Sequence, residues 1–180
     1  MDFVGAIQAG FRNYANFRGV ATRAEYWYFV LFIFLSGLVL STIDAFSSLG
    51  VLSLGFNIAT LVPSLSVLVR RLRDAGYSWT WLLTSFASLG VFLAGVIGLV
   101  SIAVNSGLMN WVQFANPNQD LDPAVLEAIA QDASFGLFAI LTFGGLLLTL
   151  GTSILVNIIF PAMPSKSAAD GNKRIKPETL

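Results

Sequence analysis

Four long apolar runs, none of which contains a charged residue, dominate this chain. They cover approximately residues 26–43, 49–69, 79–104 and 135–160. Each run is close to or above the roughly 20 residues that an α-helix needs to cross the hydrocarbon core of a bilayer. We therefore predict an all-α membrane protein with four transmembrane helices.

The composition agrees with this prediction and excludes several kinds of chemistry. Hydrophobic residues make up 56% of the chain and charged residues only 11%, whereas about a quarter of the residues of a soluble domain are charged. There is no Cys and no His, which removes thiol nucleophiles, disulfides, imidazole bases and the usual zinc and haem ligands. We expect no metal, no cofactor and no nucleic-acid partner.

The N-terminal segment, residues 1–21, is predicted to form an amphipathic helix and a turn. Its apolar side chains recur at helical spacing, at Phe3, Ile7, Phe11, Tyr14 and Phe17, which places them on one face. The stripe fits a helix lying in the membrane interface as well as one packed against the cytoplasmic end of the bundle. The segment lacks the basic leader of a cleavable signal peptide, so we expect it to remain on the protein.

Residues 22–161 form the predicted transmembrane domain, and residues 162–180 the predicted disordered basic tail, which is rich in Pro, Ser and Lys. The third and fourth spans are joined by a polar loop at residues 105–134. Within that loop, Asp122 followed by Pro123 has the form of a helix N-cap with proline at the first helical position. A short amphipathic helix is predicted from Pro123 to about Asp132.

The charges predict the orientation of the chain in the membrane. All ten basic residues precede the first span, lie between the second and third, or follow the fourth. The opposite loops hold acidic residues and no Lys or Arg, so the positive-inside rule places both termini in the cytoplasm. Four tryptophans are predicted as anchors at the membrane interfaces: Trp27, Trp79 and Trp81 at the inner one and Trp111 at the outer one.

The entry to the first span reads FRGVATRAEYWYF, residues 17–29. Thr22 followed three residues later by Glu25 is a capping-box pattern, in which the two side chains satisfy free backbone N–H groups. Alternatively, Glu25 crosses to Arg70 or Arg71, because a partly desolvated carboxylate near a membrane needs a partner. The two interpretations are compatible, since a carboxylate accepts several hydrogen bonds.

The loop between the second and third spans reads RRLRDAGYSWTW, residues 70–81. Arg70 and Asp74 are four apart and are predicted to pair on one helix face, with Gly76 ending the helix and Ser78 capping the next. Arg71 and Arg73 would then point elsewhere, toward Glu25, lipid phosphates or a partner. The simpler interpretation is that these arginines only hold the loop in the cytoplasm.

These two stretches resemble the signatures of the YhaH-like bacterial inner-membrane proteins, catalogued as domain of unknown function 805. The resemblance covers about residues 10–105 and implies an inner-membrane location. Val20 stands where the family has Arg, and Arg73 stands where it commonly has His, so an imidazole role in that motif is not available here. Signature positions are occupied by Gly19, Arg23, Glu25, Trp27, Pro63, Arg70, Arg71, Leu72, Asp74, Gly76, Ser78 and Trp79.

Few polar positions lie inside the predicted spans. The apolar runs hold Asn57, Asn157 and scattered Ser and Thr, but no charged relay group of the kind that ion-coupled transporters use. Pro63 is predicted to kink the second span and to free a backbone carbonyl.

Gly90, Ala94 and Gly98 recur every four residues on the third span. Such a stripe of small residues lets another helix approach closely. The partner helix would belong either to the same chain or to a second copy in a homo-oligomer.

We expect a non-enzymatic protein that binds membrane lipids with anionic headgroups, or a protein partner, through a cytoplasmic arginine cluster. We define this cluster as Arg23, Glu25, Arg70, Arg71, Arg73 and Asp74. A small transporter or channel using Asn57 and Asn157 is the alternative. A lipid-modifying enzyme with Glu25 or Asp74 as general base is a third class.

Overall fold

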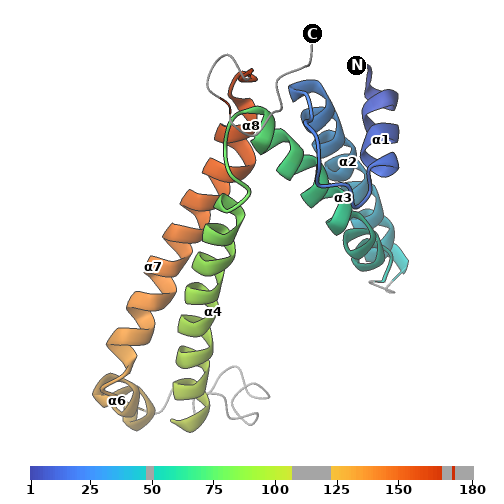
Figure 1. Ribbon diagram of the computed structural model, residues 1–180. Helices are drawn as coiled ribbons and strands as arrows, with labels where there is room; N and C mark the ends of the chain where they lie inside the picture. Colours follow the sequence, from blue (N-terminus) through green and yellow to red (C-terminus); the bar gives the residue numbers. More distant parts are fainter. Residues whose placement is uncertain (48–50, 107–122, 168–171, 173–180) are drawn as a thin grey trace. The chain divides into compact units, whose positions relative to one another are not determined.

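The computed structural model describes residues 1–47, 51–106, 123–167 and 172 (Figure 1). Every regular element within these residues is helical, and four helical stretches are long and apolar enough to cross a membrane. The predicted all-α class with four candidate spans is confirmed. The elements are α1 (Phe3–Arg12), α2 (Arg23–Ser47), α3 (Leu52–Asp74), α4 (Trp81–Asn105), α6 (Pro123–Gln131), α7 (Phe135–Ile154), the π-helix η1 (Leu155–Ile159) and α8 (Phe160–Ala162).

The helices do not end where the apolar runs end. α2 begins at Arg23 and α3 continues to Asp74, so both helices extend into the charged segments. α6 begins at Pro123, as predicted. The proposed cap Asp122 and the proposed anchor Trp111 lie outside the residues that the structure describes.

α1 is shorter than the sequence pattern predicts. The Asp2 carboxylate caps its first turn by accepting a hydrogen bond from the N–H of Gly5, and the helix ends at Arg12. The predicted helical stripe is therefore wrong beyond that point, because Tyr14 and Phe17 follow the helix. α1 packs on α2 and α3, with the ring of Phe11 5.7 Å from that of Phe29.

The α2–α3 hairpin is closed by a carboxylate. Asp44, near the end of α2, accepts hydrogen bonds from the N–H groups of Leu52 and Ser53 at 3.2 and 2.8 Å. These N–H groups belong to the first turn of α3, which has no helical acceptors for them. Asp44 thus caps the neighbouring helix and fixes how α2 and α3 meet.

Pro63 interrupts the hydrogen-bond ladder of α3, and a tyrosine repairs the defect. Because proline has no N–H, the carbonyl of Ala59 four residues earlier loses its helical donor. The hydroxyl of Tyr14 donates to that carbonyl at 2.6 Å. The freed carbonyl predicted from the sequence is therefore satisfied by the chain that follows α1.

Pro161 creates a second such defect, at the end of the fourth span. It cannot donate to the carbonyl of Asn157, which lies in the π-helix η1. The hydroxyl of Tyr26 on α2 donates to this carbonyl at 2.7 Å. π-helical turns are rare and occur often at functional sites, and here the tyrosine ties the turn to α2.

Loss of either tyrosine hydroxyl is expected to destabilise the protein. Tyr14→Phe and Tyr26→Phe each remove one hydrogen bond to a backbone carbonyl, and such a bond contributes about 0.5–1.5 kcal/mol. Tyr28→Phe is the matched control, because Tyr28 is exposed on α2 and its ring, which meets Phe3 in a T-shaped contact, is kept. Thermal unfolding in detergent measures the effect. Equal midpoints for all three variants would contradict it.

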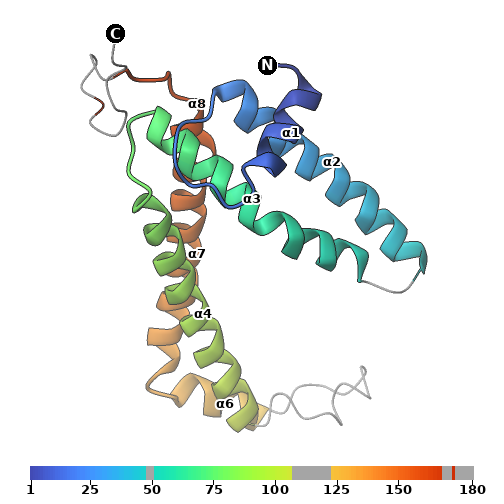
Figure 2. The same ribbon diagram turned by 45° about the vertical axis from the view of Figure 1, so that its right-hand side comes forward.

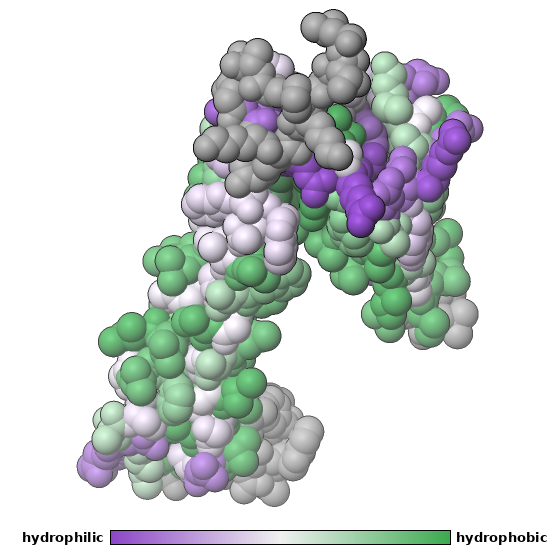
Figure 3. Space-filling view, in the orientation of Figure 1, coloured by the Kyte–Doolittle hydropathy of each residue, from purple (hydrophilic) through white to green (hydrophobic). Residues whose placement is uncertain are grey.

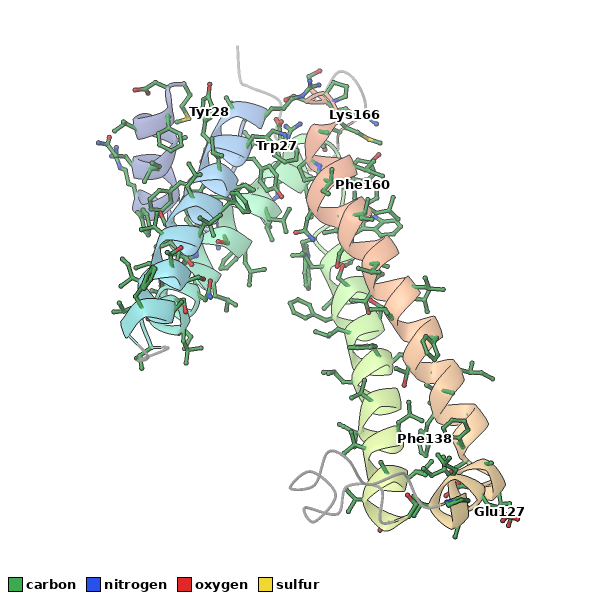
Figure 4. The ribbon with its side chains drawn as sticks, turned by 180° about the vertical axis from the view of Figure 1, so that it is seen from behind. Trp27, Tyr28, Glu127, Phe138, Phe160 and Lys166 are labelled. Atoms are coloured by element: carbon green, nitrogen blue, oxygen red, sulfur yellow. The ribbon has the colours of Figure 1, made fainter. Side chains whose placement is uncertain are left out.

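The chain divides into two compact units, Met1–Trp81 with Leu155–Leu180 and Leu82–Ile154. In the second unit α4 and α7 pack through glycines. A Cβ on Gly98 would lie 2.1 Å from the ring of Phe138, and one on Gly95 would lie 2.5 Å from the backbone nitrogen of Thr142. Phe138 on α7 is labelled beside α4 in Figure 4.

The predicted stripe of small residues on α4 forms only part of the surface that contacts α7. Gly98 is buried, but Gly90 and Ala94 are exposed, and a Cβ on Gly90 would meet nothing within 4 Å. The contact instead uses Gly95 and Gly98, with the hydroxyls of Ser88 and Thr152 3.0 Å apart. A period of 3.6 residues makes spacings of three and seven as suitable as four.

Candidate functional site

The arginine cluster lies in the first unit, where α2 begins, α3 ends and the chain after η1 returns (Figure 2). Gly76 ends α3 with a positive φ of 87°. The N–H of Tyr77 donates to the carbonyl of Leu72 at 2.8 Å and that of Gly76 to Arg73 at 3.1 Å, the two bonds of a Schellman motif. The predicted helix end at Gly76 is confirmed.

Glu25 and Arg70 form a buried ion pair across α2 and α3. The Nη2 of Arg70 lies 2.9 Å from the Oε1 of Glu25, and both side chains are almost fully buried. The backbone N–H of Glu25 also donates to the hydroxyl of Thr22 at 3.2 Å. Both sequence interpretations of Glu25 thus hold in part: Thr22 caps the helix and the Glu25 carboxylate crosses to Arg70.

Arg71, and not Arg70, is the partner of Asp74. Its guanidinium makes an ion pair with Asp74 and has no exposed surface, so the predicted Arg70–Asp74 pair is wrong. Three and four residues both bring side chains to one helix face. Because Arg70 forms its ion pair with Glu25 on α2, Asp74 pairs with Arg71.

Arg71 also holds the segment that follows η1. Its Nε donates to the carbonyl of Pro161 at 2.8 Å, and its Nη2 donates to the carbonyl of Met163. The hydroxyl of Ser165 donates to Asp74. Each nitrogen of this planar fork finds an acceptor, as a buried cation requires.

The backbone after Ser165 continues along the end of α3. The N–H of Lys166 donates to the carbonyl of Asp74 at 2.9 Å, and Lys166 is labelled at this end of the chain in Figure 4. The side chain of Asn172 donates to the carbonyls of Arg73 and Lys166 at 2.9 and 3.0 Å. The first residues of the predicted tail, up to Lys166, therefore contact the end of α3. Residues 168–171 and 173–180 lie outside the described ranges.

Arg23 and Arg73 differ from the other two arginines in having no carboxylate partner among the described residues. The Nε of Arg23 donates to the carbonyl of Met163 at 3.1 Å, and the Nη1 of Arg73 donates to that of Gly19 at 3.0 Å. Both bonds are exposed. Arg23 and Arg71 therefore converge on one carbonyl oxygen, and only Arg71 is neutralised by a nearby acid.

Aromatic rings join α8 to the end of α3. Tyr77 stacks on Phe160 with ring centroids 4.0 Å apart and planes at 11°, and Trp81 meets the same ring edge-on at 5.2 Å. Trp27, Trp79 and Trp81 are all exposed. In Figure 3 hydrophilic residues gather at the end of the first unit where α1 lies, and hydrophobic residues cover most of the visible α2–α3 surface.

A cavity of about 560 Å³ lies between α2, α3 and η1, and we call it the α2–α3–η1 cavity. Its lining is mainly apolar, with Tyr26 and Trp27 at the start of α2 and Phe34 further along that helix. Asn157 also lines it, whereas Asn57 is exposed on α3 and is not among its lining residues. The two asparagines considered for a solute path therefore do not share this cavity.

The polar chemistry of the cluster is that of guanidinium groups, two carboxylates and hydroxyls. Within the described ranges, His, Cys, Asp and Glu side chains gather nowhere in groups of three that would suit a metal ion. Both carboxylates face an arginine. The exposed polar groups of the cluster are cationic, which suits it to anionic ligands.

These features define an integral membrane protein of four candidate spans in which a buried ionic cluster joins three separate chain segments. The model of the family described as protein of unknown function (DUF805) matches residues 14–170. The chain belongs to this family.

Two inner-membrane proteins of Escherichia coli strain K12 are similar to this chain. Inner membrane protein YhaI is 36% identical over 77 residues, which are 42% of this chain and 65% of YhaI. Inner membrane protein YhaH is 33% identical over 99 residues, which are 52% of this chain and 76% of YhaH. The chain thus spans 65% of the length of YhaI. No solved structure matches it.

Proposed function

We propose that this protein binds anionic phospholipid headgroups at the cytoplasmic face of the bacterial inner membrane through Arg23 and Arg73. The observation that carries the proposal is that these two guanidinium groups, of exposed Arg23 and half-buried Arg73, donate only to backbone carbonyls. A basic side chain close to an anionic membrane surface contributes about 1 kcal/mol of binding. The planar fork of arginine also suits bidentate contact with a phosphate.

The roles of Arg70 and Arg71 in this proposal are structural. Each is buried in an ion pair, with Glu25 and Asp74 respectively. A headgroup does not reach Arg71, which has no exposed surface. These pairs fix the backbone at the start of α2 and the end of α3 and so position Arg23 and Arg73.

The orientation with both termini in the cytoplasm belongs to the same proposal. The arginines and Lys166 lie near the ends of α2, α3 and α8, whereas Glu127 and Asp132 belong to the segment around α6. The hydroxyl and N–H of Ser134 donate to Asp132, which holds the pKa of that carboxyl below its usual value. The segment between α4 and α7 contains no Lys or Arg, as the positive-inside rule expects of an outer loop.

We also propose that α1 lies in the membrane interface. It packs on α2 and α3 and still exposes apolar side chains, including Phe3, Val4 and Phe11. Exposed Trp27, Trp79 and Trp81 are placed at the same interface, which amphipathic rings prefer.

The proposed binding is non-catalytic. A general base needs a carboxylate that can reach a substrate proton. Glu25 and Asp74 are buried and each faces an arginine, so both serve the fold. Turnover of a labelled phospholipid by the purified protein, lost in Asp74→Asn, would support an enzyme instead.

Replacement of both Arg23 and Arg73 is expected to reduce the enrichment of anionic lipid around the protein. In Arg23→Gln with Arg73→Gln, we expect the ratio of phosphatidylglycerol to zwitterionic lipid that co-purifies to fall about fivefold per arginine, since 1 kcal/mol corresponds to that factor. The measurement is mass spectrometry of the lipid retained after extraction into nanodiscs.

Glu127→Gln is the control for a change of charge, because Glu127 is exposed on α6 in the second unit. It should leave the lipid ratio unchanged. An unchanged ratio in the double arginine variant would overturn the proposal. A protein that co-purifies with the wild type and is lost from the double variant would assign the two arginines to a protein partner.

A further inference from the structure

We propose that the α2–α3–η1 cavity holds one acyl chain of the anionic phospholipid whose phosphate Arg23 binds. This inference rests on the proposed function and adds to it a defined place for a single lipid. It differs from general attraction of anionic lipid to a basic surface, which needs no cavity.

The size and lining of the cavity suit an acyl chain. Its volume of about 560 Å³ falls within the range of about 300–1,000 Å³ that is usual for ligand sites. The lining residues on α2 extend from Tyr26 to Phe34, a rise of about 12 Å along a helix. One leaflet of the hydrocarbon core is about 15 Å thick, so the cavity follows most of the depth of a lipid chain.

The cationic end of the site lies one helical turn before this lining. Arg23 precedes Tyr26 by three residues and Trp27 by four, so the three side chains share a face of α2. Arg23 uses its Nε–H on Met163, and a guanidinium carries four more N–H donors on its Nη atoms. Within the described chain these have no protein acceptor, and a phosphate at the mouth of the cavity would supply one.

A hydrogen bond, and not packing alone, fixes two walls of the cavity relative to each other. The Tyr26 hydroxyl is bonded to the carbonyl of Asn157 in η1, and both residues line the cavity. The π-helical turn and Pro161 prevent an ordinary ladder at this point. An empty apolar space of this volume forfeits dispersion contacts with its lining, so it is expected to be filled. In a bilayer, the molecule available to fill it is a lipid acyl chain.

The first test fills the cavity. Val30 lines it on α2, and Val30→Trp adds an indole in its place. The full-length protein is placed in nanodiscs that contain phosphatidylglycerol and phosphatidylcholine and is then delipidated. We expect the amount of phosphatidylglycerol that stays bound to be at least tenfold lower in Val30→Trp than in the wild type. Ile97→Trp, an exposed position on α4, is the control and should retain that lipid.

The second test needs no substitution in the cavity itself. Of the four tryptophans, Trp27 lines the cavity, and a variant with Phe at Trp79, Trp81 and Trp111 leaves it as the single tryptophan, which is excited selectively. Phosphatidylglycerol brominated on its acyl chains should quench Trp27 more strongly than brominated phosphatidylcholine at the same mole fraction. Arg23→Gln should remove that difference.

The outcomes separate this inference from the proposed function. If Val30→Trp retains the lipid, or if the two brominated lipids quench Trp27 equally, the acyl site is wrong, and the general enrichment that depends on Arg23 and Arg73 is unaffected. If the double arginine variant also keeps its enrichment of anionic lipid, both are wrong. Retention of phosphatidylcholine as tightly as phosphatidylglycerol would overturn the role of Arg23 at the mouth.

Discussion

Arg71→Gln is expected to destabilise the protein by about 3–5 kcal/mol, the cost of breaking a buried ion pair by removing one partner. The change leaves the carboxylate of Asp74 without its cation. It also deprives the carbonyls of Pro161 and Met163 of their donor. The end of α3 would then lose its attachment to the segment that follows η1.

Thermal unfolding in detergent and limited proteolysis after residue 160 measure this loss. Arg73→Gln is the matched control, because Arg73 is two residues away and its hydrogen bond to Gly19 is exposed; we expect it to change stability by less than about 0.5 kcal/mol. A second variant, Arg71→Met with Asp74→Leu, removes both charges and should recover part of the stability. Equal unfolding of Arg71→Gln and Arg73→Gln would contradict the structural role of Arg71.

Gly95→Leu is expected to separate α4 from α7. Even a Cβ at this position would lie 2.5 Å from the backbone nitrogen of Thr142 and 2.8 Å from the carbonyl carbon of Leu141. Backbone atoms cannot move aside as a side chain can, so the cost should exceed the roughly 1–3 kcal/mol of ordinary overpacking. Gly90→Leu on the same helix meets open space and should be tolerated.

A disulfide provides the readout for this pair of variants. The hydroxyls of Ser88 and Thr152 are 3.0 Å apart across α4 and α7, and the chain contains no cysteine of its own. Ser88→Cys with Thr152→Cys should form a disulfide on mild oxidation in the Gly90→Leu background. Formation to the same extent in the Gly95→Leu background would show that the helices do not need this glycine.

The sequence was sufficient to predict the membrane architecture because its signals are local. Apolar run length predicts a span without knowledge of any partner, and a glycine after a basic helix end predicts a terminator. The same holds for Thr22 as a cap. The Glu25 contact with Arg70 was predictable because a buried carboxylate requires a cation and only neighbouring arginines were available.

The errors arose where tertiary contacts decide. Spacing alone favours Arg70–Asp74 as much as Arg71–Asp74, and only the position of α2 decides between them. The segment from Met163 to Lys166 has the composition of a tail. Arg71 needs more hydrogen-bond acceptors than Asp74 supplies, and the carbonyls of Pro161 and Met163 provide them. That requirement was the signal that could have placed the segment against α3.

The tyrosine partners of the two prolines were also missed. Each proline predicts a carbonyl without a helical donor four residues earlier. The sequence does not identify the hydroxyl that donates to that carbonyl. Tyr14 follows a helix that ends earlier than its apolar period suggests, and Tyr26 crosses to a π-helix. A local sequence pattern does not predict which remote hydroxyl donates to such a carbonyl.

We propose that Arg23 and Arg73, positioned by buried ion pairs, recognise anionic lipid. The direct measurement is the unfolding midpoint of the wild type in nanodiscs as phosphatidylglycerol replaces phosphatidylcholine, since a ligand that binds only the folded state stabilises it. We predict a midpoint that rises with phosphatidylglycerol and then saturates in the wild type, and a much smaller rise in Arg23→Gln with Arg73→Gln. A wild-type midpoint that does not depend on phosphatidylglycerol would contradict the claim.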